Sequence, residues 1–405
     1  MVTKKRLDLC IFLLGFLAFW ANGDNYAAAP LLVRIATDLS IDIGTAALSV
    51  TAYMLFFGLL TVFFGPLGDH FGRGRILKIA AFGSALFSML SAFVYDLPTL
   101  VAVRAVNGGF SAGIMPLAVA YAGESATPDT RQARIGQVMG FMFLGGALAT
   151  VIGGGIAYFG SWRTVYFVYG AAELLVALPL VFLLDGRTAG SPVAGLLSSY
   201  RVAFSNAPLM RTVGLLFFVG FSTLGAFAYF GKFIQDRTGL NLMLVGCLLS
   251  PYGIGTFLGG RTVGRIRAAL GTWLLAAAGL AGSAGLLAFG VTNALPSVAV
   301  PALFLYGFGF ISLQSSLITR AQDLLPSHRG TVMSAASFTM VVSGALGTLV
   351  NGRILAASGF TLLLVVAAAS FAGAGALAMA LFHASRRAPA AVQLPAEVSR
   401  PGARG

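Results

Sequence analysis

The sequence predicts an all-α membrane protein with twelve transmembrane helices in two pseudo-symmetric six-helix bundles. Of its 405 residues, 58% are hydrophobic and only 10% are charged. Soluble domains carry about 25% charged residues, so this chain has too few polar residues to cover a soluble fold of its size. Two further observations support the prediction: the number of long apolar runs, and the unequal distribution of Lys and Arg between them.

Twelve apolar runs have the length that a membrane-spanning helix needs, which is ~20 residues. They cover residues 8–31, 46–66, 76–95, 98–121, 136–159, 164–184, 212–235, 241–260, 271–291, 296–318, 331–352 and 359–383. The chain is therefore expected to cross the membrane twelve times.

Lys and Arg fall unequally on the two sides of these runs. With a cytoplasmic N-terminus, twenty of them lie in cytoplasmic segments and five in outer segments, while Arg104 lies within a span. This bias predicts that both termini are cytoplasmic. It also accounts for the net charge of +13 without a nucleic-acid partner. We expect a multi-pass protein in the lipid bilayer of a bacterial cytoplasmic membrane.

A polar segment at mid-chain divides the twelve runs into six and six. The loops after the fourth and tenth runs both contain Pro-x-x-Arg, at 128–131 and 326–329, which indicates an internal repeat. Paired halves with a site between them are a transporter architecture. The expected parts are an N-terminal six-helix bundle (1–184), a cytoplasmic linker (185–211), a C-terminal six-helix bundle (212–383) and a disordered cytoplasmic tail (384–405).

A glycine-rich polar stretch lies between the second and third runs. Residues 65–75 read GPLGDHFGRGR and include Gly65, Asp69, Gly72 and Arg73. Glycine permits a tight turn and a close helix approach because it has no Cβ. A carboxylate in a basic turn needs a partner, either a nearby Arg or the positive end of a helix. The stretch is not a phosphate-binding loop, which requires Gly-Lys-Ser/Thr after a strand.

The stretch resembles the G-x-L-a-D-r-x-G-r-k-x-x-l signature between helices 2 and 3 of the major facilitator superfamily. Leu67 and Leu77 also match, and His70 stands where Arg is usual. The resemblance implies the twelve-helix fold of that superfamily. It also implies that the glycines, the Asp and the Arg of the stretch form a cytoplasmic latch tied to the outward-open state. The alternative is a solvated basic loop that simply follows the charge bias.

Two further stretches resemble motifs of proton-coupled members of this superfamily. In the fourth span, Arg104, Asn107 and Gly108 resemble R-x-x-q-G, with Asn where Gln is usual. The fifth span resembles the antiporter motif G-x8-G-x3-G-P-x2-G-G, but Ala149-Thr150 replaces Gly-Pro. The glycines of that motif, which imply tight helix packing, are Gly136, Gly145, Gly153 and Gly154. The resemblance is greatest to twelve-helix drug:proton antiporters.

Asp24, Arg104 and Glu173 lie away from the ends of their predicted spans, where charge is costly and usually marks a pathway or a buried pair. Asp24 and Arg104 lie at similar depths in the first and fourth spans, so we expect them to pair. In that pair Asp24 would gain and lose a proton during transport; the alternative is a fixed salt bridge. Glu173, midway along the sixth span, is either a second proton site or a structural acid.

The expected substrate cavity is mostly apolar and aromatic. The resemblance implies that helices 1, 4, 7 and 10 line it. The candidate residues are Trp20, Asn22, Asn25, Tyr53, Asn107, Tyr229, Tyr252 and Gln314. Such a cavity suits lipophilic compounds, including cations, because aromatic faces attract positive charge. The alternative is that these aromatic side chains only pack against helices or lipid.

We therefore expect a secondary transporter that exports small amphipathic compounds in exchange for protons by alternating access. No catalytic constellation and no metal-ligand spacing is readable, so we expect no enzyme activity, no metal and no cofactor, with the proton gradient as energy source. The expected partners are protons and a small-molecule substrate, and the chain is expected to be a monomer. Two alternatives stay open: a metabolite exporter or proton symporter, and a membrane receptor that kept the fold without transport.

Overall fold

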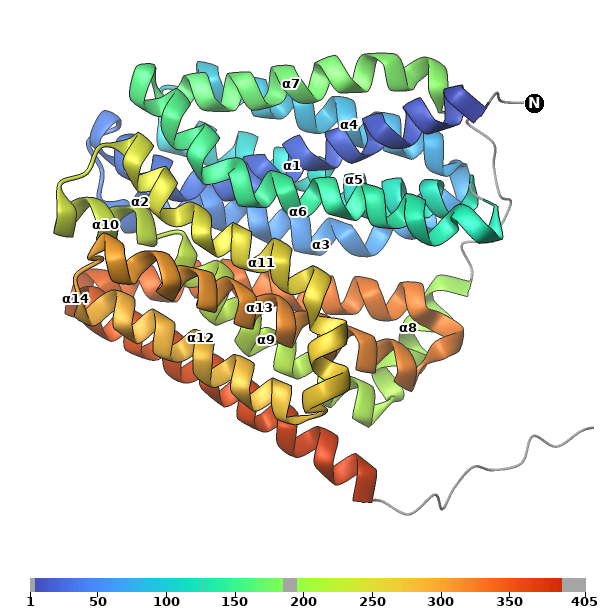
Figure 1. Cartoon of the computed structure of the whole chain (residues 1–405). Coiled ribbons are helices and arrows are strands. Elements are labelled where there is room, and N and C mark those ends of the chain that lie inside the picture. Colours follow the sequence, from blue (N-terminus) through green and yellow to red (C-terminus); the bar gives the residue numbers. More distant parts are fainter. Residues whose placement is uncertain (1–3, 126, 185–194, 388–405) are drawn as a thin grey trace, which may run out of the picture.

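The computed structural model describes residues 4–125, 127–184 and 195–387, and every regular element in that part of the chain is a helix (Figure 1). The predicted tail from residue 388 onward lies outside the described residues, as does the beginning of the predicted linker, 185–194. Residues 384–387, predicted to be disordered, instead continue the last helix. Figure 1 shows the long helices lying side by side as two stacked groups.

The first group contains the elements that precede residue 185. Its long helices pack α1 against α6 and α7, α3 against α5, and α4 against α5 and α7. The elements are α1 (Lys4–Asp38), α2 (Ile43–Ala46), α3 (Leu48–Phe71), α4 (Arg73–Leu90), η1 (Ser91–Phe93), α5 (Leu97–Glu124), α6 (Pro128–Phe159) and α7 (Trp162–Leu183).

The second group follows the linker. Here α14 packs against α9 and α12, and α13 packs against α11 and α12. The elements are α8 (Gly195–Ser205), α9 (Ala207–Phe227), α10 (Phe230–Thr238), α11 (Leu242–Leu270), α12 (Trp273–Val291), α13 (Pro296–Leu324), η2 (Pro326–His328) and α14 (Arg329–Arg387). The α8 helix lies within the segment predicted as the linker.

Eleven helices of the described chain are long and apolar enough to cross a membrane. The last of them runs for 54 residues, which is ~80 Å at about 1.5 Å per residue and far exceeds a single crossing of about 30 Å. It is broken at Gly359, whose φ of 75° is left-handed and disfavours residues with a Cβ. The two halves of α14 therefore make two crossings. The prediction of twelve spans and of an all-α membrane fold is confirmed.

Polar side chains begin several of these helices by accepting hydrogen bonds from free backbone N–H groups. Asp96 accepts from the Thr99 N–H at 2.9 Å at the start of α5. Ser161 and Thr164 form a reciprocal capping box at the start of α7. The short loops therefore carry the signals that start each return crossing.

The seventh predicted span, 212–235, is wrong as a single helix. The structure breaks it after Phe227, and α10 starts at Phe230. No Gly or Pro marks this break in the sequence. The Tyr229 hydroxyl donates to the Thr348 carbonyl oxygen at 2.7 Å. Tertiary contacts at the break therefore stabilise it, and they are not visible as local sequence signals.

The two groups meet most closely at the end of the bundle opposite the described termini, which we call the opposite face. A Cβ built on Gly154 of α6 would lie 2.4 Å from the Leu242 carbonyl oxygen of α11. One on Gly246 would lie 2.1 Å from the Thr150 carbonyl oxygen. At the same end α10 packs against α1, and one buried apolar cluster joins both groups. The orientation predicted from the Lys and Arg distribution would make this the outer side, and this conformation would then be closed toward the outside.

Candidate functional site

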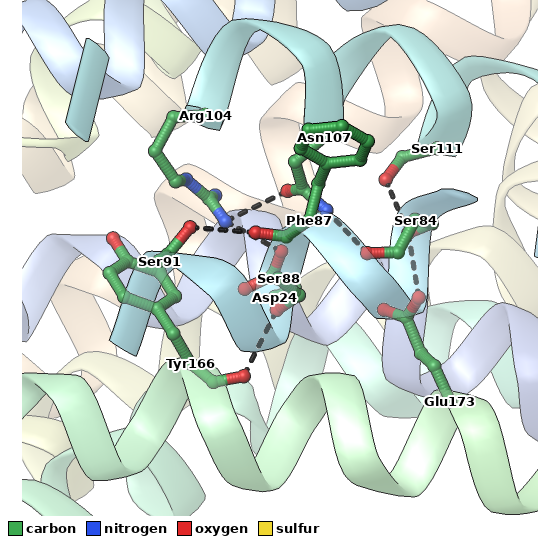
Figure 2. Close-up of polar contacts among 10 residues, drawn as sticks. All are labelled: Asp24, Ser84, Phe87, Ser88, Ser91, Arg104, Asn107, Ser111, Tyr166 and Glu173. Atoms are coloured by element: carbon green, nitrogen blue, oxygen red, sulfur yellow. Dashed lines mark hydrogen bonds and ion pairs between the residues drawn. The ribbon is translucent and has the colours of Figure 1, made fainter. Parts of the chain in front are cut away.

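A buried ion pair joins α1 to α5. Arg104 Nη1 lies 2.8 Å from Asp24 Oδ2, and both side chains are almost completely buried, at 2% and 1% exposure. The same nitrogen donates to Asn107 Oδ1 at 2.8 Å. The pair expected from the sequence is thus formed, and Figure 2 shows it beside the Asn107 amide. Removing one partner would leave the other charge buried and unpaired, which is costly.

Two tyrosine rings enclose the guanidinium. The Arg104 Cζ atom lies 4.5 Å from the ring centroid of Tyr53 and 4.5 Å from that of Tyr166. Aromatic faces attract a guanidinium, most strongly where water is excluded. Tyr53 is held by a close approach of α3 to α5, since a Cβ on Gly108 would lie 2.2 Å from its carbonyl oxygen. Gly108 is therefore required for the position of Tyr53.

A second carboxyl, Glu173 of α7, lies buried beyond Asn107. The Asn107 amide nitrogen donates to the Ser84 carbonyl oxygen at 2.8 Å. The Ser84 hydroxyl lies 2.6 Å from Glu173 Oε2 and 2.8 Å from the Ser111 hydroxyl. Glu173 Oε1 has no hydrogen-bond partner among the described residues. Ser84 thus connects the ion pair to a second acid (Figure 2).

A cavity of about 170 Å³ lies between the two groups of helices. None of the described residues that line it is charged. Its aromatic side chains are Tyr26, Tyr53, Phe57, Phe143, Tyr252 and Phe310. Its five methionines are Met54, Met115, Met142, Met333 and Met340, and its amides are Asn22, Asn25 and Gln314. Methionine is flexible and polarizable, so such a wall can adapt to ligands of different shape.

Tyr53 separates the cavity from the ion pair. Its side chain lines the cavity, and its ring also stacks on Arg104. Asp24 and Arg104 themselves do not line the cavity. A bound substrate would therefore act on the ion pair through Tyr53 and not by direct contact with either charge.

Comparison with known proteins identifies this architecture. Residues 11–348 match the family model of the Major Facilitator Superfamily. The chain belongs to this superfamily. It is therefore a multi-pass membrane protein of this superfamily, and the resemblance expected from the sequence is confirmed.

Individual relatives cover this superfamily member to different extents. The uncharacterized transporter YgaY of Escherichia coli is 32% identical over 231 residues, which are 55% of this chain and 58% of YgaY, less than two thirds of that relative. A puromycin resistance protein of Streptomyces alboniger is 25% identical over 383 residues, covering 78% of this chain and 75% of that protein. The nucleoside transporter NupG matches the fold, with a TM-score of 0.73 and 16% identity over 93% of this chain and 99% of NupG.

The cavity residues predicted from the sequence of this chain form two sets. Asn22, Asn25, Tyr53, Tyr252 and Gln314 line the cavity. The remaining three, Trp20, Asn107 and Tyr229, do not.

Each residue of the second set has another place in the fold. The Trp20 ring packs against the Tyr169 ring at 5.3 Å. Asn107 is enclosed between Arg104 and Ser84. Tyr229 lies at the helix break near the opposite face.

The glycines of the antiporter motif face different neighbours. A Cβ on Gly145 would lie 2.1 Å from the Phe19 carbonyl oxygen, and one on Gly153 would lie 3.0 Å from Ala27 Cβ, so both fit against α1. Gly154 fits against α11, as described above. Gly136 has no neighbour within 4 Å of such an atom. Three of the four glycines therefore allow close helix packing in this conformation.

The departure from the motif at Ala149-Thr150 also has a structural role. The Thr150 hydroxyl donates to the Gly246 carbonyl oxygen of α11 at 3.0 Å, across the contact between the two groups. Proline at this position could not make that bond. The substitution therefore adds a polar contact to the closure at the opposite face.

The residues of the predicted latch lie around the turn between α3 and α4, and the latch itself stays a prediction. Gly72 separates α3 from α4 and has a φ of 93°, which a residue with a Cβ rarely adopts. Arg73 lies 2.6 Å from Glu124 at the end of α5. The side chain of Asp69 lies outside the described residues, and Gly65 has no close neighbour. The sequence analysis missed Glu124, because an acid at a helix end is common and carries no signal of its own.

No group of His, Cys and carboxylate side chains in the described ranges could hold a metal ion. Ser84 and Ser111 were also missed, since serine in an apolar span is ordinary. Their importance comes from neighbours that lie far away in the sequence.

Proposed function

We propose that this superfamily member is a proton-coupled exporter of small, uncharged, amphipathic compounds. The observation that carries the proposal is that Tyr53 lines the uncharged cavity and that its ring also lies against Arg104 of the buried Asp24–Arg104 pair. The proton site and the substrate site then lie close together without sharing a charged contact.

Proton coupling would work through the ion pair. Protonation of Asp24 removes its charge, which frees Arg104 to interact with Asn107 and the two tyrosine rings alone. Since Asp24 and Arg104 lie on different helices, this changes the contact between α1 and α5. Alternation between open states would follow from that change, with the proton gradient as energy source and no chemical conversion of the substrate.

The chemistry of the cavity supports an uncharged substrate. No acid lines this cavity among the described residues, so a cation would find aromatic faces there but no carboxylate to balance its charge, whereas an uncharged substrate needs no such partner. The methionines and aromatic rings suit apolar groups, and the three amides suit hydrogen bonds. Similarity to a puromycin resistance protein supports export of a toxic compound.

A second candidate is export of one specific metabolite, and the amides favour it. Asn25 Oδ1 is buried and has no hydrogen-bond partner among the described residues, which suggests an acceptor for a substrate N–H or O–H group. Screening tells the two candidates apart, because a specific exporter would respond to one chemical class only.

The test uses the purified protein in liposomes that contain a pH-sensitive dye. Uncharged amphipathic compounds, lipophilic cations and polar metabolites are added in turn. We expect proton movement with the uncharged compounds, and its loss in Asp24→Asn. The control is Asp236→Asn, because Asp236 forms a surface ion pair with Lys232 at 2.8 Å. Proton movement that persists in Asp24→Asn would refute the role of Asp24.

A further inference from the structure

A continuous line of hydrogen bonds connects the cavity to Glu173. Ser111 of α5 lines the cavity. Its hydroxyl lies 2.8 Å from that of Ser84 on α4, which lies 2.6 Å from Glu173 Oε2 on α7. All three residues are buried, at 3%, 0% and 0% exposure. Figure 2 shows the three side chains pointing toward one another from three separate helices.

The two serines are bonded differently from several other helical serines in the described part of the chain. A serine within a helix commonly bonds to a carbonyl oxygen one turn earlier. Ser312 does so with Phe308 at 2.7 Å, and Ser91 with Phe87 at 2.9 Å. The Ser84 and Ser111 hydroxyls bond to each other and to a carboxyl instead. A chain of hydroxyl groups between a cavity and a buried acid has the arrangement that proton transfer requires.

The surroundings of Glu173 favour its neutral form in this conformation. The charged side chains that act on it are Asp24 of α1 and Arg104 of α5, which neutralise each other. On the neighbouring α6, no titratable side chain occurs between residues 135 and 157. With no cation of its own, a fully buried carboxylate would be unstable, whereas a carboxylic acid bonded to Ser84 is stable.

We propose that Glu173 is a second proton-binding site of the transport cycle, loaded and emptied from the cavity through Ser111 and Ser84. The proposal rests on the proton coupling proposed above. In this proposal both serines transfer the proton, a role that the residue type serine does not by itself suggest.

The transfer conserves atoms and charge. A proton donor in the cavity gives a proton to the Ser111 oxygen, and Ser111 passes its own proton to the Ser84 oxygen. Ser84 passes its proton to Glu173 Oε2, which becomes the neutral acid. One proton has then moved, and each serine has exchanged one O–H bond for another. Release follows the same steps in reverse.

Ser84 also links this path to the ion pair. Its carbonyl oxygen accepts from Asn107, and Asn107 accepts from Arg104. A shift of Arg104 after protonation of Asp24 would therefore move Ser84 relative to Glu173. The two acids would then load in a defined order and not independently.

The test compares Ser84→Ala, Ser111→Ala and Glu173→Gln in proteoliposomes. We expect proton-driven transport to fall by about 100-fold, the lower end of what a positioned proton-transfer group contributes to a rate. Substrate exchange without net proton movement should persist in Ser84→Ala and Glu173→Gln, because neither residue lines the cavity. Ser111→Thr, which keeps the hydroxyl, should restore the rate. The control is Ser283→Ala, a buried serine on α12 that bonds to the Ala368 carbonyl oxygen.

Infrared difference spectroscopy supplies a readout that needs no substrate. A carboxylic-acid C=O band that changes with pH and is absent in Glu173→Gln supports the proton site. The absence of that difference, in variants shown to be folded by thermal unfolding, overturns it. Normal proton-driven rates in Ser84→Ala and Ser111→Ala overturn the path. Wild-type protein that transports without any proton movement would instead refute the proposed function itself.

Discussion

Gly246→Ala should open the closure at the opposite face. The added Cβ would lie 2.1 Å from the Thr150 carbonyl oxygen, well inside van der Waals contact, and the atom that it meets belongs to a helix backbone. The two helices must separate, which lengthens the 3.0 Å hydrogen bond from Thr150 as well. Overpacking of this kind costs about 1–3 kcal/mol, which shifts the conformational equilibrium by about fivefold to about 140-fold.

The assay measures how fast a thiol in the cavity reacts with an impermeant reagent added to the outside. Leu224 lines the cavity near the opposite face, so Leu224→Cys provides the thiol. The native thiols, Cys10 and the exposed Cys247, are replaced first. We expect faster labelling in Gly246→Ala and no change in Gly264→Ala, since Gly264 lies on the same helix with no neighbour within 4 Å of the added atom.

A milder variant keeps this reasoning testable if Gly246→Ala fails to fold. Thr150→Val removes only the hydrogen bond, and such bonds between membrane helices average about 0.6 kcal/mol. The expected increase in labelling is therefore about threefold. Unchanged labelling in both variants would show that this contact does not hold the outer side closed.

Three further predictions concern the polar network and the cytoplasmic end. Asp24→Asn should lower the free energy of unfolding by about 3–5 kcal/mol, because Arg104 loses its partner. In the double variant Asp24→Asn/Arg104→Gln, the melting temperature in detergent should return to that of the wild type, but proton movement should remain lost. Tyr53→Phe should keep near-normal proton coupling while Tyr53→Ala weakens it, since only the ring contacts the guanidinium face; equal loss in both would refute this. Arg73→Gln should change stability by less than about 1 kcal/mol, because Glu124 is half-exposed and surface pairs are weak; a larger loss in thermal unfolding would contradict that.

The sequence predicted the spans and the ion pair for simple physical reasons. Long apolar runs have few alternatives to crossing a membrane. Asp24 and Arg104 are rare charges at similar depth, so their 2.8 Å contact could be expected. The role of Ser84 could not, because serine occurs in apolar spans without any special role, and only the approach of three helices brings Glu173 to it.

The break before α10 was missed for a related reason. Helix propensity and hydropathy continue through Ala228 and Tyr229, so the local pattern predicts an unbroken helix. The break depends on a hydrogen bond to Thr348 and on packing against α1, which lie far away in the sequence. Helix propensity and hydropathy therefore predict where the spans lie, but they do not predict a helix break that depends on tertiary contacts.

Tyr53 gives the clearest physical route from substrate to proton. Tyr53 lines the cavity, and its ring centroid lies 4.5 Å from the Arg104 Cζ atom. Its backbone cannot retreat toward α5, because Gly108 already lies in close contact with it. Under the proposed mechanism, a ligand that pushes the ring would displace Arg104 from Asp24 and favour protonation of that acid. Arg104 is hydrogen-bonded to Asn107, and Asn107 is hydrogen-bonded to Ser84, which contacts Glu173. The same displacement would therefore also alter the contact between Ser84 and Glu173, so that one substrate could change the protonation of both acids.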